Sequence, residues 1–301
     1  MENQWNPSYA FLSNGIAQTS VNGKSEEIRW RFTSYGPGTK LPIRLLRCHL
    51  EGFGTSAVGI GDSWSFKGAA MKSLAEAWER LCMHVYKRDE SDSDAWYASG
   101  RTVGEAMAKA RNDLVERKLL IESWQHQQGW FPYSLEDFVA TEMVSSLDRR
   151  GWSVNVHALK SQDHEIVLAG RAIHRQYGTA FNTQYLSSTQ DEVKLLRTLI
   201  RRIASAEIYE RQDDWELPDE GRPEDHAIFY QYPANARAFY FVDNCVKTPI
   251  SLPNKQEISV EMICDRGEMP PVARARHQDW GSLSWGRQSI RERNLWPHPL
   301  A

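Results

Sequence analysis

The stretch Glu76-Ala77-Trp78-Glu79-Arg80-Leu81 has a counterpart further along the chain, Asp113-Leu114-Val115-Glu116-Arg117. In each stretch two acidic residues stand three positions apart, so both carboxylates project from one face of a helix, and an arginine follows the second acid. Apolar residues at three- and four-residue spacing predict a helix over 66–87 around the first stretch and over 103–127 around the second. These two helices are the basis of the fold prediction.

Strand-like segments surround the two helices. Apolar and β-branched residues predict strands over 28–33, 43–50, 153–160, 165–173, 227–232 and 237–242. A third helix is predicted to begin at Thr189-Gln190-Asp191-Glu192, where Thr189 and Glu192 form a capping box, and to run toward Glu210. Because strands and long helices alternate, we expect a mixed α/β protein.

The composition of the 301-residue chain excludes several classes of protein. Its 36 basic and 39 acidic residues give a net charge of -3, which argues against a nucleic-acid-binding surface over the whole chain. No apolar run approaches the ~18 residues of a membrane span, and the N-terminus lacks a secretory signal, so we expect a cytoplasmic protein with no membrane segment. The four cysteines lie far apart, which disfavours a disulfide scaffold and a structural zinc site.

The acidic pairs allow a functional and a structural interpretation. Four carboxylates on two adjacent helices could position a metal–nucleotide complex, since Mg²⁺ is held by a few carboxylates together with substrate phosphates. Acids followed by arginine are also common on exposed helix faces, and Glu76 and Glu79 point away from the apolar stripe of their helix, which favours solvent exposure. Arg117, in contrast, falls inside an apolar stripe with Asp113 at its edge. It must therefore be paired or ligand-bound.

A glycine-bearing turn is expected just before the first helix. In Gly59-Ile60-Gly61-Asp62-Ser63, backbone N–H groups and the Ser63 hydroxyl could approach a phosphate at the helix N-terminus. No GxxxxGK[ST] pattern occurs, and the third glycine of a dinucleotide site is missing. The turn alone is therefore a weak signal.

The order of these features resembles the YcaO family, ATP-dependent enzymes that activate backbone amides of peptide substrates. The similarity rests on the glycine turn, on Ser73–Arg80 against the family's SAxxExxER, and on Ser99–Ala106 followed by Asp113–Arg117. It continues more faintly over 152–207 and spans about residues 44–210 in all.

The resemblance implies a YcaO-like architecture, in which mixed sheets and long helices surround one nucleotide site, usually in a homodimer. We therefore treat 1–301 as a single YcaO-like domain, with an N-terminal extension over 1–27 and a loop-rich C-terminal tail over 245–301. No separate leader-recognition domain is visible before residue 28 or after residue 245. A separate leader-peptide-binding protein could therefore act as a partner.

The resemblance also implies roles for individual residues. Acidic residues of the two helices would hold Mg²⁺: Glu76, Glu79, Asp113 and Glu116. A second group would bind ATP: Gly59, Gly61, Ser63, Lys67, Ser73, Glu105 and Arg117. Glu116 and Arg117 would also serve catalysis, together with Pro299 and Ala301, because azoline-forming members often end in a proline-rich run whose terminus reaches the active site.

Four positions depart from the family pattern. Asp113 stands where the family usually has a glutamate, which shortens the reach by one methylene. Ile60 replaces a lysine often seen within the glycine turn, so Lys67 is the nearest basic substitute. In the third helix, Arg201 stands where a glutamate is expected and Ala204 where a glutamine is expected. An arginine in place of a carboxylate reverses the local charge, so the chain could handle the nucleotide differently or no longer hydrolyse ATP.

Three interpretations remain open. The first is an ATP- and Mg²⁺-dependent enzyme that forms azolines, amidines or thioamides on a precursor peptide in ribosomal-peptide natural product biosynthesis. The second is a catalytically degenerate relative that binds a peptide or a partner protein as a scaffold. The third is an α/β protein whose acid-acid-Arg helices face solvent, for which an exposed, unpaired Arg117 would be the sign. The sequence identifies neither the substrate peptide nor the nucleophile.

Overall fold

The computed structural model describes residues 15–21, 23–34, 44–87, 95–208, 238–252, 254–264 and 268–280. The chain divides into two compact units. Unit 1 comprises Met1–Leu114 and Asn254–Gly281, and unit 2 comprises Val115–Pro253 and Ser282–Ala301. Each unit contains a four-stranded antiparallel sheet.

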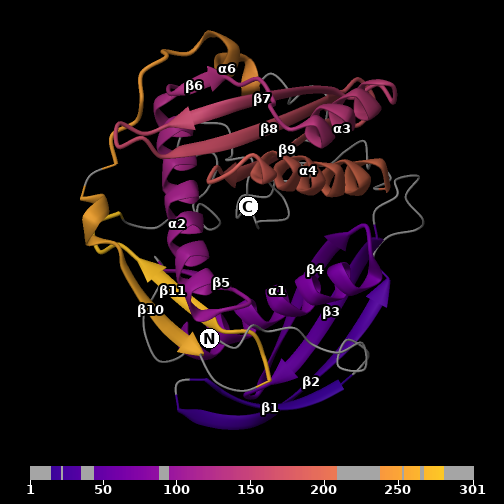
Figure 1. Cartoon of the computed structure of the whole chain (residues 1–301), viewed down its shortest axis with the longest axis vertical. Helices are drawn as coiled ribbons and strands as arrows, with labels where there is room; N and C mark the ends of the chain where they lie inside the picture. Colours follow the sequence, from indigo (N-terminus) through magenta and orange to yellow (C-terminus); the bar gives the residue numbers. More distant parts are fainter. Residues whose placement is uncertain are drawn as a thin grey trace, which may run out of the picture. The chain divides into compact units, whose positions relative to one another are not determined.

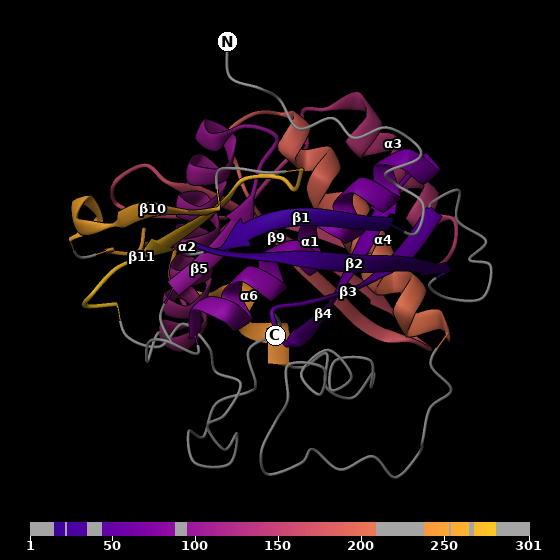
Figure 2. The ribbon, with the colours of Figure 1, turned by 90° about the horizontal axis from the view of Figure 1, so that it is seen from below.

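The sheet of unit 1 follows the order of the chain. Its strands are β1 (Gly15–Val21), β2 (Lys24–Ser34), β3 (Arg44–Gly52) and β4 (Thr55–Ser63), coloured indigo to violet in Figure 1. β1 and β2 lie side by side along their length (Figure 2). A second, three-stranded sheet in this unit has the order β10 (Ser259–Cys264), β11 (Val272–Arg276), β5 (Ala95–Ser99).

Helix α1 (Phe66–Lys87) packs against β3 and β4. The residues of its apolar stripe have no solvent-accessible surface: Ala70, Leu74, Ala77, Trp78 and Leu81. They share one core with residues from both sheets of unit 1, among them Ile28 and Val272. Burying each large apolar side chain contributes about 1.5–3 kcal/mol, so this stripe fixes the helix on the sheet.

Gly59 and Gly61 lie within β4 and not in a turn, so the predicted glycine turn is wrong. The strand approaches α1 so closely that a Cβ atom at Gly59 would collide with the Ser73 carbonyl oxygen, and one at Gly61 with the Ala69 carbonyl oxygen. Glycine is required here because two backbones meet.

The sheet of unit 2 has helices on both faces. Its strands are β6 (Trp130–Pro132), β7 (Ser153–Lys160), β8 (Ile166–His174) and β9 (Gly178–Tyr185), in that order. Helices α3 (Phe138–Asp148) and α4 (Gln190–Ile208) cover one face (Figure 1). On that face Leu195 packs against Ala158 and Leu168. Because side chains alternate along a strand, His157 and Thr183 point to the other face. The short helix α6 (Tyr240–Asn244) contacts that face.

Helix α2 (Val103–His126) begins in unit 1 and ends in unit 2. A 3₁₀ turn, η2 (Lys255–Glu257), precedes β10. None of the helices in the described ranges is long and apolar enough to cross a membrane. All four cysteines lie in the described ranges, and none of them forms a disulfide: Cys48, Cys82, Cys245 and Cys264.

Helical periodicity in the sequence located the helices well. The predicted helix over 66–87 is α1, and the one over 103–127 differs from α2 by one residue. The strand predicted over 237–242 is wrong, since α6 occupies its second half, and the strand predicted over 227–232 lies outside the described residues. The range 1–27 contributes β1 and the start of β2, and the range 245–301, expected to be loop-rich, contributes β10 and β11.

Candidate functional site

The two acidic side chains of α1 face protein and not open solvent. Glu76 accepts a hydrogen bond from the Ile60 N–H at 2.9 Å and pairs with Arg80 at 2.7 Å. Its side chain is 29% exposed, and that of Glu79 is 16% exposed. The expectation of solvent exposure is therefore wrong, because β4 packs against the helix on the side where Glu76 projects.

Glu79 gathers three donors on a single carboxylate oxygen. Its Oε1 accepts the Ser99 N–H and the Ser99 hydroxyl, each at 2.6 Å, and the Lys109 ammonium at 2.9 Å. Ser99 ends β5, and Lys109 lies in the second turn of α2. The acid thus ties α1 to the strand and the helix that follow it in the chain.

Acidic side chains govern the charge of Lys109. Burial alone would lower the pKa of this lysine, but the neighbouring carboxylates of Glu79, Asp113 and Glu76 outweigh that effect and raise it. Lys109 is therefore a persistent cation. Sequence reasoning missed it, although its spacing of four residues from both Glu105 and Asp113 on the same helix was visible.

The residues predicted to cradle phosphate are engaged in local structure. The Ile60 N–H, at the centre of the glycine pair, donates to Glu76. The Ser63 hydroxyl accepts the Ser65 N–H at 3.4 Å, and the buried Ser73 hydroxyl donates to the Ala70 carbonyl at 3.1 Å. Lys67 is half-buried in the first turn of α1. Their role toward ATP stays a prediction.

Glu105 caps the start of α2. Its carboxylate accepts the Arg101 N–H at 3.1 Å and Arg101 Nε at 3.3 Å, while its own N–H donates to the Thr102 hydroxyl at 3.1 Å. A threonine followed three residues later by glutamate is the capping signature, which this sequence carries at Thr102-Val103-Gly104-Glu105. The observed contacts of Glu105 therefore have a structural explanation.

Glu116 and Arg117 belong to unit 2, where Glu116 is fixed to strand β9. Its two oxygens accept the Thr183 hydroxyl at 2.6 Å and the Tyr185 N–H at 2.7 Å. Burial raises the pKa of Glu116, although these two hydrogen bonds and Arg117 oppose the rise. Burial also lowers the pKa of Arg117 to about 10, against the attraction of Glu116.

The position of Arg117 argues against the interpretation in which the acid-acid-Arg helices face solvent. Arg117 is half-buried beside Glu116, and not exposed as an acid-acid-Arg helix on the surface would require. The Glu116 carboxylate opposes the fall in the pKa of Arg117. Asp113, half-buried one turn earlier, raises the pKa of Lys109, and its predicted pairing with Arg117 stays a prediction.

The start of α4 is built differently from the predicted capping box. Asp191 accepts the N–H groups of Ser187 and Ser188, both at 2.9 Å. Glu192 has no accessible surface and accepts the Tyr133 hydroxyl at 2.8 Å and the Asp137 N–H at 2.9 Å. The start of the helix was predicted within one residue. The Glu192 carboxylate, however, binds residues of a distant loop and not Thr189, as a capping box would require. Further along α4, Arg201 is half-buried and Ala204 is buried.

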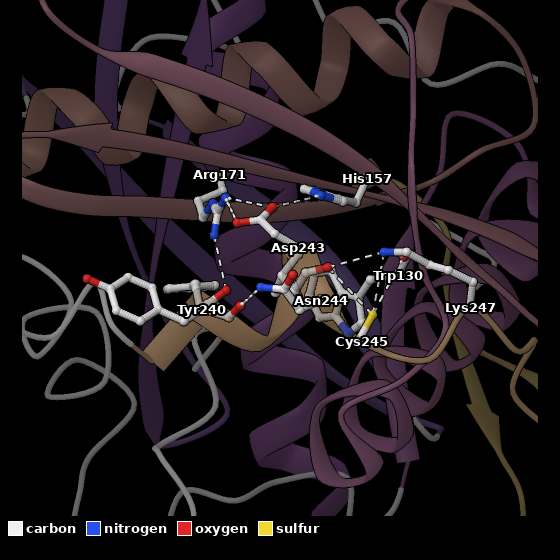
Figure 3. Close-up of polar contacts among 10 residues, drawn as sticks. Trp130, His157, Arg171, Tyr240, Asp243, Asn244, Cys245 and Lys247 are labelled. Atoms are coloured by element: carbon white, nitrogen blue, oxygen red, sulfur yellow. Dashed lines mark hydrogen bonds and ion pairs between the residues drawn. The ribbon is translucent and has the colours of Figure 1, made fainter.

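A second polar cluster joins α6 to the sheet of unit 2 (Figure 3). The Asp243 carboxylate lies 3.3 Å from an Arg171 guanidinium nitrogen and 3.7 Å from His157 Nε2. Arg171 also donates to the Phe239 carbonyl at 3.2 Å, and Lys247 donates to the Trp130 carbonyl at 2.6 Å. No motif signalled this cluster, because its members come from three separate parts of the chain.

Within either unit, the described acidic residues do not form a ready site for a resident Mg²⁺ ion. Within the described ranges, no group of three or more His, Cys, Asp or Glu side chains lies close enough to hold a metal. Glu79 Oε1 already accepts three donors, and both oxygens of Glu116 accept hydrogen bonds. The predicted set of four carboxylates is thus not assembled within either unit. Pro299 and Ala301 lie outside the described residues.

Comparison with solved structures identifies the fold. YcaO from Methanopyrus kandleri, bound with AMPPCP and Mg²⁺, matches with a TM-score of 0.55 over 86% of this chain and 88% of that chain, at 11% identity. The chain has a YcaO-like fold. The predicted mixed α/β fold is thereby confirmed, and at this identity the likeness concerns the fold alone.

Two heterocyclase structures match more weakly. The heterocyclase TruD gives a TM-score of 0.42 at 12% identity, over 70% of this chain and 34% of that chain. A heterocyclase in complex with substrate and cofactor gives 0.41 at 14%, over 62% and 28%. The chain thus spans about a third of the length of these two proteins. No family model matches the sequence, and no curated protein matches it in sequence.

Proposed function

We propose that this chain is an ATP-dependent, YcaO-like enzyme that activates a backbone amide of a peptide. The likeness to a YcaO bound with AMPPCP and Mg²⁺ extends over most of both chains, and it supports the resemblance drawn from the acid-acid-Arg stretches. The observation that carries the proposal is the half-buried Glu116–Arg117 pair. It keeps a partly desolvated guanidinium on the helix where the resemblance places a phosphate contact.

The proposed reaction has two bond-forming steps. A thiol, hydroxyl, amine or sulfide nucleophile gives up a proton to solvent and adds to the peptide carbonyl carbon, and the carbonyl oxygen becomes an alkoxide. That oxygen attacks the γ-phosphorus of ATP and ADP departs. The resulting phosphate then leaves carbon, and a proton leaves nitrogen, or sulfur in the case of sulfide. The product is an azoline from a thiol or hydroxyl, an amidine from an amine, or a thioamide from sulfide. Phosphoryl transfer needs positioning and charge neutralisation from the protein.

Arg117 would supply that neutralisation. A guanidinium presents N–H donors in a planar fork that suits phosphate oxygens, and a low-dielectric setting strengthens the contact. Glu116, fixed by Thr183 and the backbone of Tyr185, would hold the arginine in place. Mg²⁺ would arrive with ATP as part of the substrate.

The proposal includes the expected setting of the reaction. The substrate would be a precursor peptide of ribosomal-peptide natural product biosynthesis, and the enzyme a cytoplasmic homodimer assisted by a separate leader-binding protein. Azoline formation, a cyclodehydration, is the most specific form of the proposal. The C-terminal Pro299 and Ala301 would then reach the active site.

Peptide-stimulated ATP hydrolysis tests the proposed function. The assay measures phosphate release with a mixture of short peptides containing Cys, Ser and Thr. We expect stimulation in the wild type and a loss of at least ~100-fold in Glu116→Gln, the scale of removing one preorganised electrostatic group. Glu142→Gln, an exposed glutamate of α3, is the matched control and keeps the wild-type rate. Normal turnover in Glu116→Gln would rule out the assignment of Glu116.

A non-catalytic scaffold is the second candidate. It is favoured by Arg201 and Ala204 on α4, which replace two expected polar residues, and by the carboxylates of unit 1 being engaged by protein donors. Calorimetry separates the two functions. Tight binding of a peptide, without binding of AMPPCP in the presence of Mg²⁺, would select the scaffold.

A further inference from the structure

The Lys109 ammonium binds the Glu79 carboxylate, the group that would otherwise be open to coordinate a metal ion. Three donors converge on Glu79 Oε1, and of these only the Lys109 ammonium carries a full positive charge. The Glu79 side chain is 16% exposed, whereas that of Lys109 is 47% exposed. The Glu79 carboxylate is thus largely enclosed, whereas the side chain of its lysine partner reaches solvent.

Other carboxylates of unit 1 surround the same ammonium. Asp113 lies one turn along α2 from Lys109, and Glu76 lies one turn before Glu79 on α1; both act electrostatically on the lysine. Arg80 already pairs with Glu76 at 2.7 Å. The acidic positions of this unit are therefore balanced by side-chain cations.

We infer that the Lys109 ammonium takes the place of a divalent cation at Glu79. A Mg²⁺ ligand oxygen must lie about 2.0–2.1 Å from the metal, and Glu79 Oε1 already accepts three donors. A doubly charged ion at the other oxygen of the same carboxylate would lie beside the ammonium and be repelled by it. Glu79 therefore pairs with the lysine in preference to a divalent ion.

This inference deepens the proposed function, on which it rests for the identity of the site. A lysine neutralises phosphate oxygens as a point charge, so Lys109 would meet the phosphates of ATP directly. The metal that accompanies ATP would then be held by phosphates without Glu79. In unit 1 the negative charge of the phosphates would then be neutralised by Lys109, which is a permanent part of the protein.

Binding of Mn²⁺ alone, in place of Mg²⁺ and without nucleotide, tests the inference. Calorimetry and electron paramagnetic resonance compare the full-length wild type with Lys109→Met. In Lys109→Met the carboxylates of Glu79, Glu76 and Asp113 lose the positive charge of the ammonium. We therefore expect Mn²⁺ to bind at least ~10-fold more tightly, a change of about 1.4 kcal/mol. The double variant Lys109→Met/Glu79→Gln returns to the wild-type affinity.

Two control variants show whether a change in Mn²⁺ affinity is due to the charge of Lys109. Lys118→Met removes a lysine of the same helix that pairs with Glu122 at 2.6 Å, and it leaves Mn²⁺ binding unchanged. Lys109→Arg keeps the charge and also keeps the wild-type affinity. If far-ultraviolet circular dichroism shows that Lys109→Met does not fold, Lys109→Gln takes its place with the same expected gain.

Two outcomes would overturn the inference. One is equal Mn²⁺ affinity in the wild type and the uncharged Lys109 variant. The other is wild-type binding of Mn²⁺ that Glu79→Gln abolishes. Since the assay contains neither ATP nor peptide, failure of the proposed ATP-dependent reaction leaves its result unaffected, and the two failures can be told apart.

Discussion

His157 is a buried histidine that the fold keeps neutral. Its side chain is 7% exposed on β7, and burial, together with the positive charges of Arg171 and Lys247, lowers its pKa from 6.5 to about 4. Asp243 opposes this shift but is itself engaged with Arg171. The folded protein therefore binds fewer protons at this histidine than the unfolded chain does between pH 4 and 6.5.

A pH-dependent loss of stability follows at this residue. Stability rises with pH wherever the unfolded state binds more protons, so the contribution is intact above pH 6.5 and falls as pH drops toward 4. From the shift we expect a loss of roughly 3 kcal/mol by pH 4. Urea unfolding of the wild type and His157→Gln over this range measures it, and the variant shows the shallower dependence.

The exposed His84 of α1 serves as the control for this prediction. His84→Gln is expected to keep the wild-type pH dependence, because His84 is exposed and belongs to unit 1, whereas Arg171 and Asp243 belong to unit 2. If His157→Gln and the wild type lose stability in parallel on acidification, the loss originates elsewhere and the assignment to His157 is wrong.

The close contact between β4 and α1 leaves no room for a side chain at Gly59 or Gly61. An added methyl group at Gly59 or Gly61 meets backbone atoms of α1, which cannot move aside as a side chain does. We expect Gly59→Ala and Gly61→Ala each to destabilise the protein by about 1–3 kcal/mol, the usual cost of overpacking. Urea denaturation measures the change.

Gly104→Ala provides the matched control for these two substitutions. Gly104 is exposed in the first turn of α2, where alanine is the better helix former, so the substitution leaves stability equal or slightly increased. Wild-type stability in Gly59→Ala would show that the strand and the helix can separate without cost.

Local patterns predicted the helices, but pairing between distant segments was out of reach. The stripe of Leu74, Trp78 and Leu81 marked α1 because its period is a property of the segment itself. The glycines of 59–61 were interpreted as a turn, since nothing in the segment shows that a helix backbone lies against it. β11 pairs with β5 across more than 170 residues, so its range was expected to be loop.

The same limit applies to the candidate site. The resemblance singled out Glu76, Glu79 and Glu116, and each is a half-buried hydrogen-bond acceptor in the structure. Their partners come from other elements: Lys109 lies 30 residues from Glu79, and Thr183 lies 67 residues from Glu116. Which cation faces an acid is decided by tertiary packing, so the sequence suggested a metal where the fold supplies a lysine at Glu79.

At the scale of the whole molecule, the cysteines are divided unevenly between the two units. Cys48, Cys82 and Cys264 belong to unit 1 and are buried, whereas Cys245 belongs to unit 2 and is partly exposed. Burial raises the pKa of Cys48 to about 12 and raises that of Cys82 as well. Because thiolates are the reactive form, poor access and a raised pKa both protect Cys48 and Cys82, and poor access protects Cys264.

Thiol labelling therefore reports the opening of unit 1 separately. In native protein at pH 8 we expect Ellman's reagent to modify Cys245 rapidly and the other three only through opening of unit 1. Cys245→Ser removes the fast phase and leaves the slow one, and full denaturation exposes every remaining thiol. With increasing urea, the slow phase accelerates as unit 1 opens. Rapid native labelling of Cys48 or Cys82 would contradict the packing of α1 against its sheet.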